Sequence, residues 1–181
     1  MPPIGDDEQP WRCVALQSQL GFCKATRALW EVAVETDCEY VFWLEHDFVF
    51  QREVDLRELA DVLDDHRSLA QMSLMRQPIS PREVEAGGVV KNHERMSDEF
   101  YSHISGPLTE RREWLSHEAY FTTNPSLMRR QFMADTMWPR EDAECEGRFG
   151  LQLKEAGYSF GIWGDGSPWV EHIGQRDGHG Y

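Results

Sequence analysis

The run Tyr40–Leu44 consists entirely of apolar and aromatic residues and ends abruptly at Glu45-His46-Asp47. Such a run is too short for a helix and is typical of a strand that other elements cover on both faces. The preceding segment, residues 21–35, carries apolar side chains at spacings of three, four and seven, which predicts an amphipathic helix. A strand that directly follows a helix indicates an α/β fold.

Strand and helix patterns alternate over most of the chain. We expect further strands at residues 12–16, 68–75, 117–122, 158–163 and 169–172, and helices that begin at Asp55, at Asn124-Pro125 and near Ala143. This alternation predicts one domain over residues 1–181, with a mostly parallel central sheet and helices on both faces. Residues 82–116 are polar and broken by glycine and proline, so we expect an excursion that forms an acceptor-binding or lid region. The glycine-rich tail, residues 174–181, is expected to move.

The charge balance restricts the partners of the protein. The chain has 32 acidic and 18 basic residues, a formal net charge of −14, and its basic residues are scattered. This argues against general nucleic-acid binding, which needs clustered Lys and Arg. With no long apolar run and no signal-peptide pattern, the sequence predicts a cytoplasmic protein without membrane contact. The cysteines, at positions 13, 23, 38 and 145, lack zinc-ligand spacing and are expected to be reduced.

Glu45-His46-Asp47 is the first candidate site, because ligands of parallel sheets bind beyond the carboxyl ends of the strands. Two carboxylates one residue apart can both face a divalent cation. The alternative is a strand that simply ends in polar residues. The apolar residues on both sides favour a site, since an unpaired carboxylate near a core is costly. His172, which ends the last predicted strand, would add a nitrogen ligand and favour manganese over magnesium.

Glu146 is the second candidate. It falls on the face of its predicted helix that also carries Phe149 and Leu153, whereas Glu144 and Arg148 project elsewhere. An acid is thereby held against apolar neighbours. Taken alone, a structural role in the first helical turn is the simpler interpretation.

These features occur in an order that resembles a known family. The order begins with a helix that contains Gly21–Arg27 and a strand that runs into Glu45-His46-Asp47. It continues with an acid that opens a helix closed by Lys154–Tyr158, and it ends with Val170–His172. This order is similar to that of GT-A-fold nucleotide-sugar glycosyltransferases of family 2. The resemblance covers residues 11–175. Such enzymes usually begin with two further strand units that hold the nucleotide base, whereas only about ten residues precede the first predicted strand here. The expected explanations are a sequence that starts late, a minimal variant, or a partner chain that completes the nucleotide site.

The resemblance implies transfer of a hexose from a nucleoside diphosphate sugar, with UDP as the expected nucleotide, to an acceptor hydroxyl with inversion. The acceptor would be a glycan, a protein or a modified DNA base. Glu45-His46-Asp47 looks like the D-x-D motif with Glu in place of the first Asp, so Glu45 and Asp47 would contact the donor and, with His172, hold Mn²⁺ or Mg²⁺. Glu146 matches the catalytic acid that takes the acceptor proton, and Arg176 in the tail would bind the diphosphate.

Two other classes of function fit the same residues. A metal-dependent phosphohydrolase or nuclease would use the same acids, but it would release phosphate or nucleotides without forming a glycoside. A non-catalytic sugar- or nucleotide-binding module would bind without reaction. Trp114 and Trp138 are candidate sugar platforms, although packing in the core is the simpler role for both.

Overall fold

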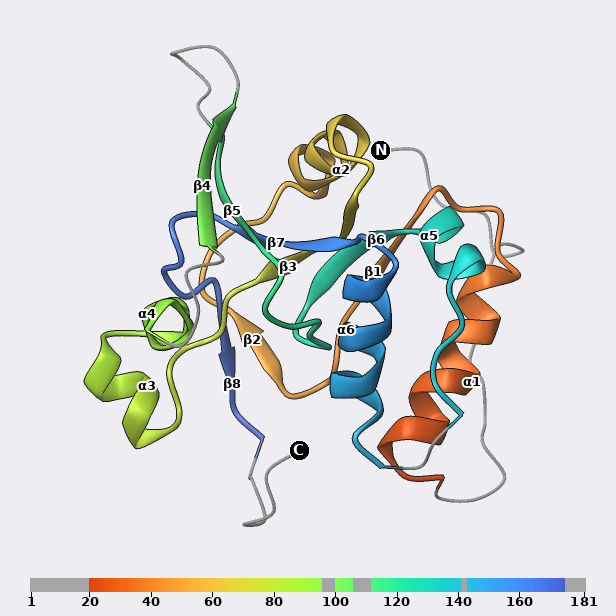
Figure 1. Ribbon diagram of the computed structural model, residues 1–181, viewed down its shortest axis with the longest axis horizontal. Coiled ribbons are helices and arrows are strands. Elements are labelled where there is room, and N and C mark those ends of the chain that lie inside the picture. Colours follow the sequence, from red (N-terminus) through yellow and green to blue (C-terminus); the bar gives the residue numbers. More distant parts are fainter. Residues whose placement is uncertain (1–19, 96–99, 106–111, 141–142, 175–181) are drawn as a thin grey trace, which may run out of the picture.

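The computed structural model describes residues 20–95, 100–105, 112–140 and 143–174 (Figure 1). A six-stranded sheet in the order β1-β6-β3-β7-β5-β4 forms its centre, and a two-stranded sheet pairs β2 with β8. The predicted strand at residues 12–16, Arg176 and nearly all of the predicted mobile tail lie outside the described residues.

The strands and helices alternate irregularly along the chain. The strands are β1 (Tyr40–Trp43), β2 (Phe48–Phe50), β3 (Leu69–Leu74), β4 (Phe100–Ser105), β5 (Arg112–His117), β6 (Ser126–Arg129), β7 (Ser159–Trp163) and β8 (Val170–His172). The helices are α1 (Phe22–Val34), α2 (Leu56–Asp65), α3 (Pro81–Ala86), α4 (Val89–Glu94), α5 (Arg130–Asp135) and α6 (Cys145–Glu155). In the described part of the chain, no helix combines the length and the apolar character that crossing a membrane requires.

The sheet is mixed and largely antiparallel. Only β3 and β7 pair in parallel, whereas β6 runs antiparallel between β1 and β3, and β5 runs antiparallel to β7 and to β4. The prediction of a mostly parallel sheet is therefore wrong. It assumed that each strand reaches its neighbour through a helical crossover, but β6 is inserted between two earlier strands and β4–β5 is a hairpin. The mixed α/β character of the fold is confirmed.

Helices cover both faces of the sheet, as predicted (Figure 1). On one face, α1, α5 and α6 enclose a cluster around Trp30. Its indole is tilted against Trp138, meets Phe149 edge to face, and donates a 2.9 Å hydrogen bond to the Met133 carbonyl. On the other face, α2 packs Leu59 and its neighbours against β3, β6 and β7. Asp55 caps α2 as predicted, because its side chain accepts a hydrogen bond from the Arg57 N–H.

The segment before and within β6 departs from its predicted structure. β5 already ends at His117, and residues 118–125 form an irregular connection instead of the predicted strand. Asn124-Pro125 precedes β6 and does not begin a helix. Asparagine followed by proline is a local helix-start signal, but here hydrogen bonds to two distant strands outweigh it.

The predicted excursion, residues 82–116, has regular structure where it is described. It contains most of α3, all of α4 and β4, and most of β5. The β4–β5 hairpin joins the edge of the sheet beside β7. Val89 and Val90 of α4 are buried against β5 and β7, so this helix is packed on the sheet. Its role as an acceptor-binding or lid region stays a prediction.

Cys23 and Cys145 form a disulfide that joins the first turns of α1 and α6. The expectation of reduced cysteines is therefore wrong for this pair. The 122 positions that separate them conceal the pairing in the sequence. Cys38 is an exposed free thiol, and Cys13 lies outside the described residues. The cytoplasmic location stays a prediction.

Arg129 ties β6 to the end of α2. Its side chain is buried, and its guanidinium donates hydrogen bonds to the carbonyls of Leu63, Arg67 and Leu69, the last two at 2.9 and 2.7 Å. These carbonyls lie in the last turn of α2, in the connection that follows it and at the first residue of β3. The last turn of a helix leaves carbonyl acceptors without donors from the helix itself. The Arg129 side chain thus supplies hydrogen-bond donors to the carbonyls where the chain reverses between α2 and β3.

We expect Arg129→Met to lower the free energy of unfolding by about 2–4 kcal/mol, because it leaves these carbonyls without their charged donor. Urea denaturation measures the loss. Arg82→Met, at an exposed position of α3, is the matched control and should change stability by less than about 0.5 kcal/mol. Equal stability of the two variants would contradict the role of Arg129.

Candidate functional site

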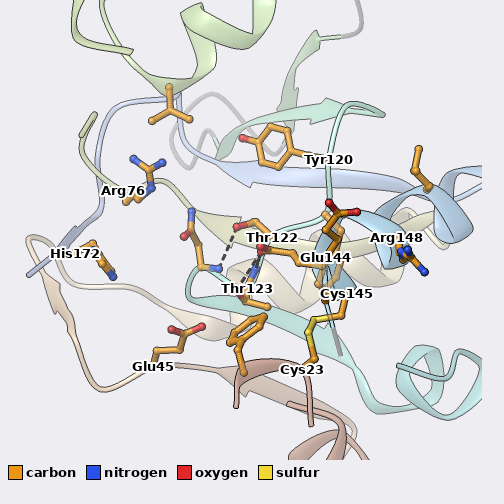
Figure 2. Close-up of a pocket in the computed structure, with 18 of the residues that line it drawn as sticks. Cys23, Glu45, Arg76, Tyr120, Thr122, Thr123, Glu144, Cys145, Arg148 and His172 are labelled. Carbon is orange, nitrogen blue, oxygen red and sulfur yellow. Dashed lines mark hydrogen bonds between the residues drawn. A yellow bond between two sulfur atoms is a disulfide. The ribbon is translucent and has the colours of Figure 1, made fainter. Parts of the chain in front are cut away.

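The strand order gathers polar residues at one end of three neighbouring strands, β1, β6 and β3. β1 and β3 run in the same direction, because both are antiparallel to the β6 strand between them. The segments after β1, after β3 and before β6 therefore meet, and they carry Glu45, Arg76 and Thr123. Together with Glu146 of α6 and His172 of β8, these residues line a cavity of about 880 Å³ (Figure 2).

Asp47 and His172 form a close pair beside this cavity. The β2–β8 ladder places Phe48 opposite His172, and the Ile173 N–H donates a 2.8 Å hydrogen bond to the Asp47 carbonyl. As a result, Nε2 of His172 lies 3.1 Å from Oδ2 of Asp47. The other carboxylate oxygen, Oδ1, is buried and has no hydrogen-bond partner among the described residues. A buried carboxylate oxygen without a partner is costly, so this position favours a bound cation or donor.

Glu45 lies in an acidic environment. Burial raises the pKa of Glu45, and the nearby charges of Asp47 and Glu146 raise it further, whereas a hydrogen bond with Thr123 and the charge of His46 act in the opposite direction. The net effect is a pKa above the ordinary value of 4.5. The acids of this region therefore repel one another, and a cation bound among them would relieve that repulsion.

Glu146 is held at the cavity by the first turn of α6. Its Oε1 accepts hydrogen bonds from the Thr123 N–H at 2.6 Å and from the Thr123 hydroxyl at 3.1 Å. Phe149 and Leu153 are buried, which confirms the predicted apolar neighbours on the same helix. The preceding residues are also constrained, because Cys145 is disulfide-bonded and Glu144 has a positive φ of 54°. Thr123 thus holds the carboxylate of Glu146, and the disulfide at Cys145 restrains the main chain just before it.

The described residues contain no group of three or more His, Cys, Asp or Glu side chains arranged to hold a metal ion, so Glu45, Asp47 and His172 do not form such a group. The Asp47–His172 pair nevertheless fits part of a metal site. It offers one oxygen and one nitrogen ligand, and Oδ1 of Asp47 lacks any other partner among the residues described. A cation there would need further ligands from a substrate or water.

The sequence analysis missed Arg76 and Glu83. Both guanidinium nitrogens of Arg76 donate to the Glu83 carboxylate at 3.1 Å, and Glu83 also accepts from the N–H groups of Ile79 and Ser80. The Ser80 hydroxyl accepts from the Glu83 N–H, which completes a capping box at the start of α3. Serine followed three residues later by glutamate is a signal that could have identified this structure.

An aromatic stack on the α4 side of the cavity was also missed. The ring of Tyr120 lies between those of His93 and His117, with centroid distances of 4.3 and 4.5 Å. Burial lowers the pKa of His117 to about 3, so its imidazole is neutral at neutral pH. Trp114 and Trp138, the candidate sugar platforms, are each 1% exposed and belong to the two core clusters.

The Arg76–Glu83 pair predicts a pH dependence of stability. Burial raises the pKa of Glu83, but hydrogen bonds from Arg76, Ile79 and Ser80 outweigh it and lower the pKa from 4.5 to about 2. The carboxylate therefore stabilises the fold fully above pH 4.5, and this contribution disappears as the pH falls towards 2. We expect Glu83→Gln to cost about 2 kcal/mol at pH 7 and progressively less below pH 4.5.

Urea denaturation across that pH range measures the difference between the Glu83→Gln variant and the unmodified protein. Glu85→Gln, at an exposed position of the same helix, is the control and should have little effect at any pH. A difference for Glu83→Gln that does not change with pH would contradict the predicted ionisation.

Comparison of the chain with protein-family models, with curated proteins and with solved structures finds no match. The resemblance to GT-A glycosyltransferases is therefore neither supported nor opposed by a relative. The residues that line the cavity are the basis for a functional assignment.

Proposed function

We propose that the protein is a metal-dependent glycosyltransferase that moves a hexose from a nucleoside diphosphate sugar to an acceptor hydroxyl. One observation carries this proposal. Residues from three segments that are far apart in the sequence, Glu45, Glu146 and His172, line the same cavity. They are the residues that match the donor motif, the catalytic acid and the late histidine of the family.

The Asp47–His172 pair marks the donor side of the site. Asp47 supplies an oxygen and His172 a nitrogen, and they would hold Mn²⁺ or Mg²⁺ together with oxygens of the diphosphate. The bound cation would stabilise the negative charge that develops on the departing diphosphate. Glu45, on the cavity wall, would contact the donor directly or through water. The net charge of −14 makes such a cation necessary for binding an anionic donor.

Glu146 supports the chemistry on the acceptor side. The N–H and hydroxyl of Thr123 both donate to its Oε1, and such bonds stabilise a carboxylate that is ready to accept a proton. In the proposed reaction, the acceptor oxygen attacks the anomeric carbon while Glu146 takes its proton. The bond from that carbon to the diphosphate breaks, and the electron pair leaves with the diphosphate. Attack in a single displacement gives inversion.

The volume of the cavity suits a substrate of this kind. About 880 Å³ lies within the range of small-molecule and cofactor sites. The wall combines aromatic rings, such as those of Phe48 and Tyr120, with ionisable groups on several elements. Additional contacts to the nucleotide base from a partner chain, and an anion contact from Arg176, stay predictions.

We expect Asp47→Asn to reduce manganese-dependent hydrolysis of UDP-sugars by at least about tenfold, since even groups that only support a metal ligand contribute that much to metal affinity. The measurement is UDP release over a titration with Mn²⁺. Asp37→Asn, an exposed position outside the cavity lining, is the control and should leave the rate unchanged. Full metal-dependent activity of Asp47→Asn would contradict its role.

We expect Glu146→Gln to slow glycoside formation by about 100-fold or more while donor binding stays nearly intact, because general-base catalysis contributes that much. Product analysis by mass spectrometry and calorimetry with UDP and Mn²⁺ separate the two effects. Glu155→Gln in the same helix is exposed and serves as the control. Release of phosphate or nucleotides without any glycoside from the unmodified protein would instead identify a phosphohydrolase or nuclease.

A further inference from the structure

Thr123 lies between two acids of the site. Its N–H and hydroxyl donate to the same oxygen of Glu146, at 2.6 and 3.1 Å. Its side chain also lies beside Glu45 and acts against the rise that burial causes in the pKa of Glu45, but the one hydroxyl proton is directed at Glu146. Figure 2 shows Thr123 with Glu45, from the connection after β1, on one side and Cys145, the first residue of α6, on the other. Thr123 therefore lies beside both carboxylates and makes its two hydrogen bonds to Glu146.

The main chain around Thr123 is fixed to its surroundings on both sides. The Leu74 N–H of β3 donates a 2.8 Å hydrogen bond to the Pro125 carbonyl, and the Asn124 N–H donates to the Thr122 hydroxyl at 3.1 Å. With its amide oriented to satisfy both groups, the buried Gln71 side chain bonds the Thr122 carbonyl at 3.0 Å and the Thr122 N–H at 3.2 Å. Thr123 therefore lies in a connection whose main chain is hydrogen-bonded to β3 just before β6 begins.

The close approach of α6 adds a second restraint. A Cβ atom at Gly150 would lie 3.0 Å from the Phe121 nitrogen and 3.3 Å from the Phe121 Cβ, so the helix rests directly on the segment that leads to Thr123. The Cys23–Cys145 bond holds the helix start one residue before Glu146. The distance between Thr123 and Glu146 is therefore set by the packing of α6 on this connection.

We propose that Thr123 is a positioning residue, which holds the carboxylate of Glu146 in the orientation needed to receive the acceptor proton. This inference rests on the proposed function. The N–H of Thr123 provides one constraint and its hydroxyl a second one. Both act on Oε1 of Glu146, so they hold that oxygen in place and leave Oε2 to receive the proton. A base held in this way needs no reorientation during the reaction.

The test compares Thr123→Val, which keeps the shape and the N–H but removes the hydroxyl, with Thr123→Ser, which restores it. We expect Thr123→Val to lower kcat for glycoside formation by about 10- to 100-fold, the equivalent of one hydrogen bond to a charged group, with an unchanged KM for the donor. Thr123→Ser should recover most of the rate. Thr136→Val, whose hydroxyl bonds only the Phe132 carbonyl away from the cavity lining, is the control.

A double-mutant cycle separates positioning from a general structural effect. In a Glu146→Gln background, Thr123→Val should cause little further loss, because the base that it orients is already removed. An equal loss in both backgrounds, or a wild-type rate for Thr123→Val, would overturn the proposal.

The amide proton of Thr123 gives a readout that does not depend on activity. In NMR spectra of the full chain, Glu146→Gln should move this resonance upfield, because the charge at the acceptor of a short hydrogen bond is lost. An unmoved resonance would overturn the contact and, with it, the positioning role. If the unmodified protein forms no glycoside from any nucleotide sugar while the resonance moves, the proposed function fails and the contact itself stands.

Discussion

β6 is hydrogen-bonded on both sides, antiparallel to β1 through four residue pairs from Tyr40–Arg129 to Trp43–Ser126, and antiparallel to β3 at Leu127 and Ser126. This double pairing forces β1 and β3 to run in one direction. The chain must therefore leave both strands at the edge where it enters β6. Glu45, Arg76 and Thr123 meet for this reason, although up to 78 positions separate them in sequence. Glu146 of α6 and His172 of β8 then join the residues that the pairing of β6 brings together.

The electrostatics of that edge follow from its construction. The connection after β1 and the first turn of α6 bring Glu45, Asp47 and Glu146 into one region. Burial, and then the charges of Asp47 and Glu146, raise the pKa of Glu45. Arg76, a neighbouring positive charge, is already paired, because two of its nitrogens donate hydrogen bonds to the Glu83 carboxylate. Carboxylates that cluster without an equal number of free Lys or Arg side chains destabilise the fold. A bound cation, as in the proposed site, would offset that cost.

The features that depend on local signals could be predicted from the sequence, whereas those that depend on distant pairing could not. Asp55 as the cap of α2 and the buried face of α6 follow from residues within one or two helical turns. In α1, the spacing of apolar residues predicts a buried face that includes Leu29 and excludes Trp30. This is wrong for both residues, because Leu29 is 46% exposed whereas Trp30 is 1% exposed and organises the aromatic cluster. The order of β6 in the sheet and the contact of Thr123 with Glu146 have no local signature, since each depends on segments that meet only in the folded chain.

The disulfide closes a covalent ring that spans 122 positions of the sequence, from the first turn of α1 to the first turn of α6. Asp47 and Thr123 lie inside this ring, and Glu146 follows it directly. A protease that cuts the main chain once between Cys23 and Cys145 would therefore leave two fragments that stay attached to each other. Such nicked protein would migrate as one species on a non-reducing gel and as two after treatment with a thiol, while the elements around the cavity remain joined.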